Sequence, residues 1–171
     1  MSHSVAGEPP SAGRRAATST TAGYSAAEWE LLTNLPGRVL VVAARPAVGG
    51  PLRGVAAGLA GLDAVAAGRA SDSDLVRAVV ADIYARHEGA SAPVEHLGGL
   101  VDALACCRAA VRVLRRGADP ADSAAYRQWV QSVAARVCRI GPTGVPAPAG
   151  VALAPPDRRF LDRLGGALDL G

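Results

Sequence analysis

The chain has 171 residues, with no lysine, a single asparagine and an aromatic content of only 4%. The absence of lysine excludes an enzyme that works through a lysine Schiff base. Its three cysteines, Cys106, Cys107 and Cys138, are too few for a disulfide scaffold, and an odd count with a vicinal pair is typical of a reducing cytoplasm. The longest uncharged stretch, 140–156, is interrupted by prolines, so we expect no membrane-spanning helix.

Hydrophobic residues make up 50% of the chain, which is enough for the core of one domain and excludes a disordered protein. The 20 glycines, 12 prolines and arginine-only basic set are typical of a GC-rich bacterial genome. A net charge of +3 is too small to predict a nucleic-acid partner. Arg14 and Arg15 resemble a twin-arginine signal, but the residues after them are too polar for export. We therefore expect a cytoplasmic protein.

Residues 1–23 have little periodicity and are predicted to form a disordered tail, followed by one helical domain over 24–171. Ser25 and Glu28 have the spacing of a capping box, and Tyr24 and Trp29 that of a hydrophobic staple. A helix is therefore expected to start at Ser25. We expect it to break near Asn34 and to continue as a second helix over 36–44.

Five further helices are predicted from apolar spacing and capping residues. No strand pattern appears, so the prediction is an all-α fold, a compact single-domain bundle of about six or seven helices. The loop 141–155 is either a lid or a connector. The predicted helices are 51–67, with the apolar stripe Leu52, Val55, Ala56, Leu59 and Leu62; 73–87; 91–116, with the stripe Leu97, Leu100, Val101, Leu104, Cys107, Val111 and Leu114; 120–139, capped by Asp119; and 156–168.

Three segments carry a family resemblance: Ser25–Leu32, Asp74–Asp82, and Ala125–Val137 with the Gly-rich loop and helix that follow it. In these segments the chain resembles small, mostly uncharacterised bacterial helical proteins whose C-terminal half is similar to the tellurite-resistance TerB-like fold. The resemblance implies that fold for most of residues 24–168. It also implies a link to metal-associated stress through acidic residues in loops.

The chain departs from that pattern where the acids are expected. Arg45 and Pro46 stand after the first long helix, where family members usually carry an acidic residue. A Gly-Pro-Thr-Gly-Val segment, 141–145, replaces the family's Glu-Gly-Gly-Phe before the last helix. At these two places the chain lacks the acidic residues to which the resemblance ties the metal role.

One helix carries a basic stripe formed by Arg108, Arg112, Arg115 and Arg116. Their spacing places them on one face, where they form either a solvated surface or a binding site for an anion or acidic partner. Arginine suits such a site because its guanidinium makes bidentate contacts with carboxylate and phosphate.

The sequence contains no cofactor motif and no close-spaced set of zinc ligands. His96 and Cys107 are too far apart along one helix to form a nucleophile pair, so Cys107 is expected in the core. An interhelical pocket, if present, would be lined by Trp29, Tyr126, Trp129 and Cys138.

The leading hypothesis is a non-catalytic cytoplasmic module that binds an acidic partner protein or an anionic small molecule, with no cofactor and no nucleic acid. The first alternative is a small cofactor-independent enzyme of specialised metabolism with an apolar pocket between helices. The second is TerB-like metal binding. A filled core with an exposed apolar patch favours the first hypothesis, and a deep cavity favours the enzyme.

Overall fold

The computed structural model describes residues 21–45, 50–87 and 98–170, and within them the chain is all-helical. The β-structure in these ranges is an isolated bridge between Ile140 and Pro146. Most of the predicted tail, residues 1–20, lies outside the described residues. The elements are α2 (Ala26–Ala44), α3 (Pro51–Ala67), the short 3-10 helix η1 (Gly68–Ala70), α4 (Asp74–His87), α5 (Leu100–Gly117), α6 (Pro120–Cys138) and α7 (Pro155–Ala167).

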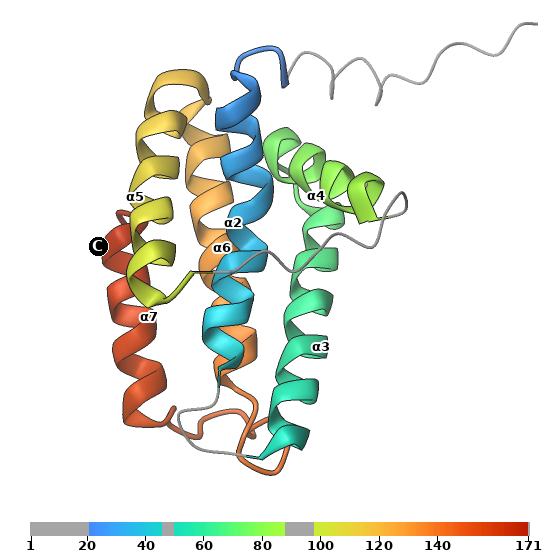
Figure 1. Ribbon diagram of the computed structural model, residues 1–171, viewed down its shortest axis with the longest axis vertical. Coiled ribbons are helices and arrows are strands. Elements are labelled where there is room, and N and C mark those ends of the chain that lie inside the picture. The colour runs from blue at the N-terminus through green and yellow to red at the C-terminus, as the bar shows by residue number, and fades with distance from the viewer. Residues whose placement is uncertain (1–20, 46–49, 88–97, 171) are drawn as a thin grey trace, which may run out of the picture.

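The helices pack as a bundle around α2 and α6 (Figure 1). α2 has α5 on one side and α3 on the other, and α6 lies behind it. α7 packs against α5 and α6, while α4 crosses one end of the bundle beside α2 and α6. One continuous core joins these helices, so the predicted all-α bundle is confirmed.

The predicted start of the first helix is confirmed. Ser25 N donates to Glu28 Oε2 at 2.9 Å, and Glu28 N donates to Ser25 Oγ at 3.2 Å, which completes the capping box. The rings of Tyr24 and Trp29 lie 5.9 Å apart, as a hydrophobic staple requires. These contacts fix the point at which the chain enters the bundle.

The predicted break near Asn34 is wrong, because α2 continues through Pro36 to Ala44. Proline has no N–H, so Pro36 leaves the carbonyl of Leu32 without its intrahelical donor. The Tyr126 hydroxyl from α6 donates to that carbonyl at 2.6 Å. Burial of Pro36 and this long-range hydrogen bond keep the helix continuous.

The bounds predicted for α3 are confirmed, but the stripe that revealed the helix faces solvent. Its buried side consists of small residues and one arginine: Arg53, Ala57, Gly61, Ala64 and Val65. The large apolar residues Leu52, Val55, Leu59 and Leu62 are all more than half exposed. α3 therefore packs on the bundle through the side that carries its small residues.

Side-chain caps also mark the starts of α4 and α6. Ser73 caps α4 through a 3.2 Å hydrogen bond from Val76 N, and Asp119 caps α6 through one of 2.8 Å from Ala121 N. α5 begins at Leu100, whereas the predicted start at Ser91 lies outside the described residues. Val101, predicted on the buried stripe of this helix, is exposed. The buried side of α5 carries Ala103, Cys107 and Ala110, and Val101, two residues before Ala103, lies on nearly the opposite side of the helix.

Candidate functional site

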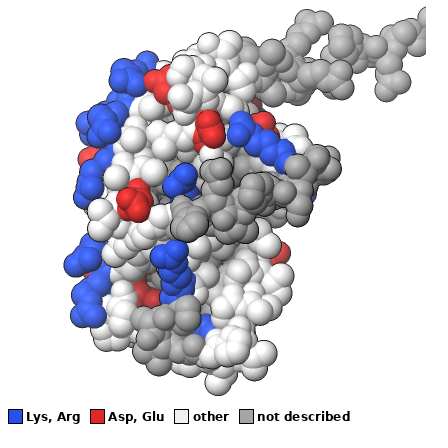
Figure 2. Space-filling view, in the orientation of Figure 1, with Lys and Arg blue, Asp and Glu red and all other residues white. Residues whose placement is uncertain are grey.

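The predicted basic stripe lies on the surface of α5. Arg108, Arg112, Arg115 and Arg116 are all exposed. The neighbouring helix α7 adds three more exposed arginines, so that arginines line the edge that α5 and α7 form in Figure 2. We call this surface the arginine edge; its α7 members are Arg158, Arg159 and Arg163.

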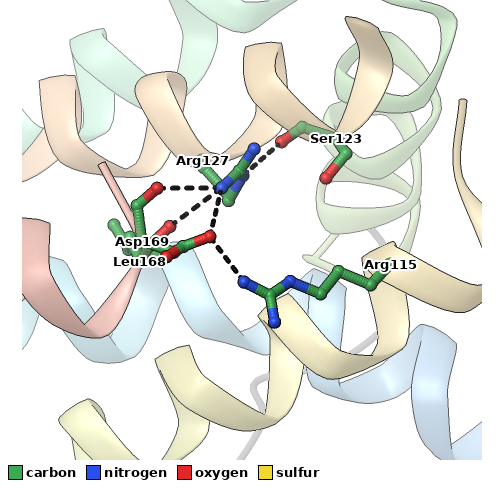
Figure 3. Close-up of polar contacts among 5 residues, drawn as sticks. All are labelled: Arg115, Ser123, Arg127, Leu168 and Asp169. Carbon is green, nitrogen blue, oxygen red and sulfur yellow. Dashed lines mark hydrogen bonds and ion pairs between the residues drawn. The ribbon is translucent and has the colours of Figure 1, made fainter. Parts of the chain in front are cut away.

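Arg115 is engaged in holding the C-terminal end of α7. Its Nη2 lies 2.7 Å from Asp169 Oδ2, and Arg127 of α6 approaches the same oxygen at 3.4 Å (Figure 3). Arg127 also donates to the backbone carbonyl of Asp169 at 3.0 Å and to that of Ser123 at 3.1 Å. These contacts join α5, α6 and the end of α7, and they hold Asp169 in a left-handed conformation with φ of 57°. Arg115 therefore has a structural role.

Arg116 is engaged in an ion pair as well, with a carboxylate of α2. Its Nη2 lies 2.7 Å from Glu28 Oε1, so it extends the capping box of α2. The hydrogen bonds from Ser25, together with Arg116, lower the pKa of the Glu28 carboxyl below its ordinary value. Arg116 thus links the end of α5 to the start of α2.

Arg108 and Arg112 differ from these two. Across residues 21–45, 50–87 and 98–170 neither of them forms an ion pair, and both side chains are exposed. The predicted stripe therefore divides into two arginines that join α5 to other elements and two that have no ion pair with the described residues. The sequence spacing could not separate these pairs, because the carboxylates of Asp169 and Glu28 reach the helix only through the tertiary fold.

Of the four predicted pocket residues, Trp29, Tyr126, Trp129 and Cys138, three belong to the core. Tyr126 is fully buried, and its ring meets that of Trp129 at a centroid distance of 5.8 Å. Trp129 donates from its indole nitrogen to the Ala64 carbonyl at 3.3 Å. Trp29 is partly buried and donates to Asp82 Oδ2 at 2.9 Å. The structure brings the rings of Tyr126 and Trp129 together, whereas the ring of Trp29 contacts that of Tyr24.

A shallow depression of about 420 Å³ lies between the end of α3 and α6. Trp129 lines it, whereas Trp29, Tyr126 and Cys138 do not. Its polar lining comes from two serines, one glutamine and one arginine: Ser71, Gln128, Ser132 and Arg136. This depression is open to solvent and differs from the deep cavity that the enzyme hypothesis requires.

The buried cysteines are unreactive at neutral pH. Burial raises the pKa of the Cys107 thiol to about 12, and burial together with the nearby Asp157 carboxylate raises that of Cys138 to about 12. Both thiols therefore stay protonated, and the protonated form is a poor nucleophile. Cys107 lies in the core as predicted, and His96 lies outside the described residues.

Arg53 is a buried polar residue that sequence reasoning missed. Its side chain is 6% exposed, its Nε donates to the Ile140 carbonyl at 3.2 Å, and its Nη2 lies 3.8 Å from Asp157. Its Nη1 has no hydrogen-bond partner among the residues that the structure describes. Burial raises the pKa of the Asp157 carboxyl despite the arginine beside it. The one available signal was its position, since Arg53 shares a helical face with Ala57, Gly61 and Ala64.

In the described part of the chain, no group of three His, Cys, Asp or Glu side chains is placed to hold a metal ion. None of the helices described there has both the length and the apolar character needed to cross a membrane. Comparison of the chain with protein-family models, curated proteins and solved structures finds no match. The TerB-like resemblance therefore stays a prediction.

Proposed function

We propose that this protein is a non-catalytic cytoplasmic module that binds an acidic surface of a partner protein through the arginine edge. The observation that carries the proposal is the state of Arg108 and Arg112, which are exposed on one face of α5 without a carboxylate partner in the described residues. They lie one helical turn apart, so both guanidinium groups can reach neighbouring carboxylates on one partner.

The arginines of α7 broaden this surface. Arg158, Arg159 and Arg163 are exposed on the helix that packs against α5, and Figure 2 shows basic side chains following that edge. Asp162 is interleaved with them and lowers the net positive charge of the surface. A basic surface such as the arginine edge accelerates the encounter with an acidic partner and makes binding sensitive to salt.

The filling of the core supports a binding module over an enzyme with an interhelical pocket. Tyr126 and Cys138 are buried by neighbouring side chains, and the nearby surface depression is shallow. Exposed apolar residues lie on α3 instead. A filled core with an exposed apolar patch is typical of proteins that act through association.

The cytoplasmic part of the proposal rests on the cysteines. Cys106, Cys107 and Cys138 are all free thiols. Free thiols persist in reducing compartments.

The test uses a fluorescently labelled glutamate-rich peptide as the probe, titrated with the full chain at low salt and followed by anisotropy. We expect the double variant Arg108→Gln/Arg112→Gln to bind at least about tenfold more weakly than the wild type, with a flatter salt dependence. The matched control is Arg77→Gln/Arg86→Gln on α4, which removes the same charge from exposed residues on another helix.

Equal weakening by both double variants would assign binding to net charge and contradict the proposal. Unchanged binding by Arg108→Gln/Arg112→Gln would contradict it as well. A parallel titration with inorganic phosphate separates the two ligand classes. Tight phosphate binding, lost in Arg108→Gln/Arg112→Gln, would favour an anionic small molecule over an acidic protein surface.

A further inference from the structure

The outer face of α3 is an apolar surface that the bundle does not cover. Leu52 is 75% exposed, Val55 65%, Leu59 60% and Leu62 57%. We call these four residues the α3 seam. Leaving four large apolar side chains in water on one helix costs free energy, since burying each would yield about 1.5–3 kcal/mol. This surface is separate from the arginine edge.

The spacing of the α3 seam is that of a coiled coil. Its members are separated by three, four and three residues, which matches the a and d positions of successive heptads. The core side of α3 uses other residues, among them Ala57, Gly61 and Ala64. α3 therefore has one face packed in its own bundle and a second face patterned for another helix.

We propose that the α3 seam packs antiparallel against the α3 seam of a second copy of this chain. The seam is symmetric about the level of residue 57, because 52 and 62 lie five residues away from it and 55 and 59 lie two away. A two-fold axis at that level places Leu52 opposite Leu62 of the second copy and Val55 opposite its Leu59. An isologous contact needs this kind of self-complementary patch.

The residues beside the seam allow a second helix to approach closely. Ala56 and Gly58 flank it, and a Cβ added at Gly58 would have nothing within 4 Å. Small residues at such positions let two helix backbones come near each other. The seam can thus be covered without rearranging the bundle.

The charges on α3 favour a second copy over a charged partner. Arg53 is turned into the core, so Asp63 is the exposed charged residue of this helix. In the antiparallel arrangement each Asp63 lies beside Pro51 of the other copy, and the two acids are about 18 Å apart along the axis by the 1.5 Å rise per residue. Like charges are therefore kept apart, and an oppositely charged partner would find almost nothing to pair with.

The size of the surface sets the expected strength. α3 has 17 residues and is about 25 Å long. One helical seam buries less than the roughly 800 Å² per partner of a standard interface, so the dimer should be weak and concentration-dependent. A Cβ added at Gly144 would lie 3.2 Å from the Leu52 carbonyl, so the loop that carries Gly144 and the 63% exposed Val145 passes close to one end of the seam.

The first experiment is sedimentation velocity of the full chain from about 1 to 500 μM, a range suited to weak interfaces. We expect the wild type to shift from monomer to dimer and Val55→Glu/Leu59→Glu to stay monomeric, because the axis brings four added carboxylates together. The matched control is Val101→Glu, which charges a 78% exposed valine on α5 and should dimerise like the wild type. Circular dichroism verifies that each variant is folded.

The second experiment tests the antiparallel register in a Cys106→Ser background, which removes the one cysteine that is not buried. A mixture of Leu52→Cys and Leu62→Cys chains should form a disulfide-linked heterodimer on mild oxidation, and neither chain alone should cross-link. Cross-linking of each chain with itself would show a parallel pair and overturn the proposal.

A wild type that stays monomeric at every concentration also overturns the proposal. So does a Val55→Glu/Leu59→Glu variant that dimerises as the wild type does. If the monomeric wild type binds phosphatidylcholine vesicles and this variant does not, the seam belongs to a membrane surface instead. None of these outcomes affects the peptide-binding test of the arginine edge, because Arg108 and Arg112 lie on α5.

Discussion

The contact between Tyr126 and Pro36 shows how one side chain compensates for a defect in another element. Pro36 removes the donor that the Leu32 carbonyl would have inside α2. The Tyr126 hydroxyl replaces it with a 2.6 Å hydrogen bond across the core. Because Tyr126 is fully buried, a carbonyl left without this donor would find no water.

Replacing Tyr126 by phenylalanine should therefore destabilise the protein by about 1–3 kcal/mol, the cost of an unsatisfied buried acceptor. In a Pro36→Ala background the new backbone N–H can donate to Leu32, so the same replacement should cost about 1 kcal/mol less. Urea unfolding of the four proteins measures this coupling as a double-mutant cycle. Equal costs in both backgrounds would contradict the compensation.

At the scale of elements, α3 packs closely because its inner side is small. A Cβ at Gly61 would lie 2.5 Å from Leu40 Cγ of α2 and 3.0 Å from Val137 Cγ2 of α6. Gly61 thus occupies the point where three helices meet. Gly37 on α2 offers a contrast, since a Cβ there would have nothing within 4 Å.

Gly61→Ala should lower the free energy of unfolding by about 1–3 kcal/mol, because Leu40 and Val137 must move to admit the methyl group. Gly37→Ala makes the same chemical change at an open position inside a helix and should raise it by about 0.5–1 kcal/mol. Thermal and urea unfolding measure both. A neutral Gly61→Ala variant would show that the α2–α3 contact is looser than the structure describes.

Local signals in the sequence predicted these elements well and their orientation poorly. The capping pairs Ser25/Glu28 and Asp119/Pro120 gave the starts of α2 and α6, because a cap depends on residues within one turn. The sequence did not show that the large apolar residues of α3 face outward, since an apolar stripe has the same period whether it faces the core or another molecule. The predicted break at Asn34 was wrong because the hydroxyl that satisfies the Leu32 carbonyl belongs to Tyr126, which lies far along the chain.

The candidate site was predictable to the same limited extent. Helical spacing placed the arginines of α5 on one exposed face, which the structure describes. It could not show that Arg115 and Arg116 are bound to Asp169 and Glu28, because those carboxylates lie on other elements. Burial of Arg53 was hidden for the same reason, as it follows from which side of α3 meets the bundle.

At the scale of the whole molecule, ion pairs between distant segments join the two ends of the described chain to α5. Glu28 at the start of α2 pairs with Arg116, and Asp169 after α7 pairs with Arg115. Each exposed ion pair of this kind contributes little to the free energy of unfolding. Their effect should appear in the response of stability to pH, because each depends on an ionised carboxylate.

Glu28 gives the sign of that response. Hydrogen bonds from Ser25 and the pairing with Arg116 lower its pKa in the folded protein below the ordinary value of 4.5. An acid with a lowered folded pKa stabilises the protein above its unfolded pKa, and the stabilisation is lost as the pH falls through the folded value. We therefore expect Glu28→Gln to melt below the wild type at pH 7, and the gap to close as the pH falls below about 4.5, the range in which glutamate titrates.

Melting temperatures from pH 7 to pH 3 test this expectation. The matched control is Glu30→Gln, which removes a carboxylate from the exposed side of the same helix without touching the capping box, and its melting profile should follow the wild type. Arg116→Gln should reproduce part of the Glu28→Gln effect, because the contacts from Ser25 remain in that variant. A Glu28→Gln profile parallel to the wild type over the whole range would mean that the carboxylate charge at the entry to the bundle adds nothing to its stability.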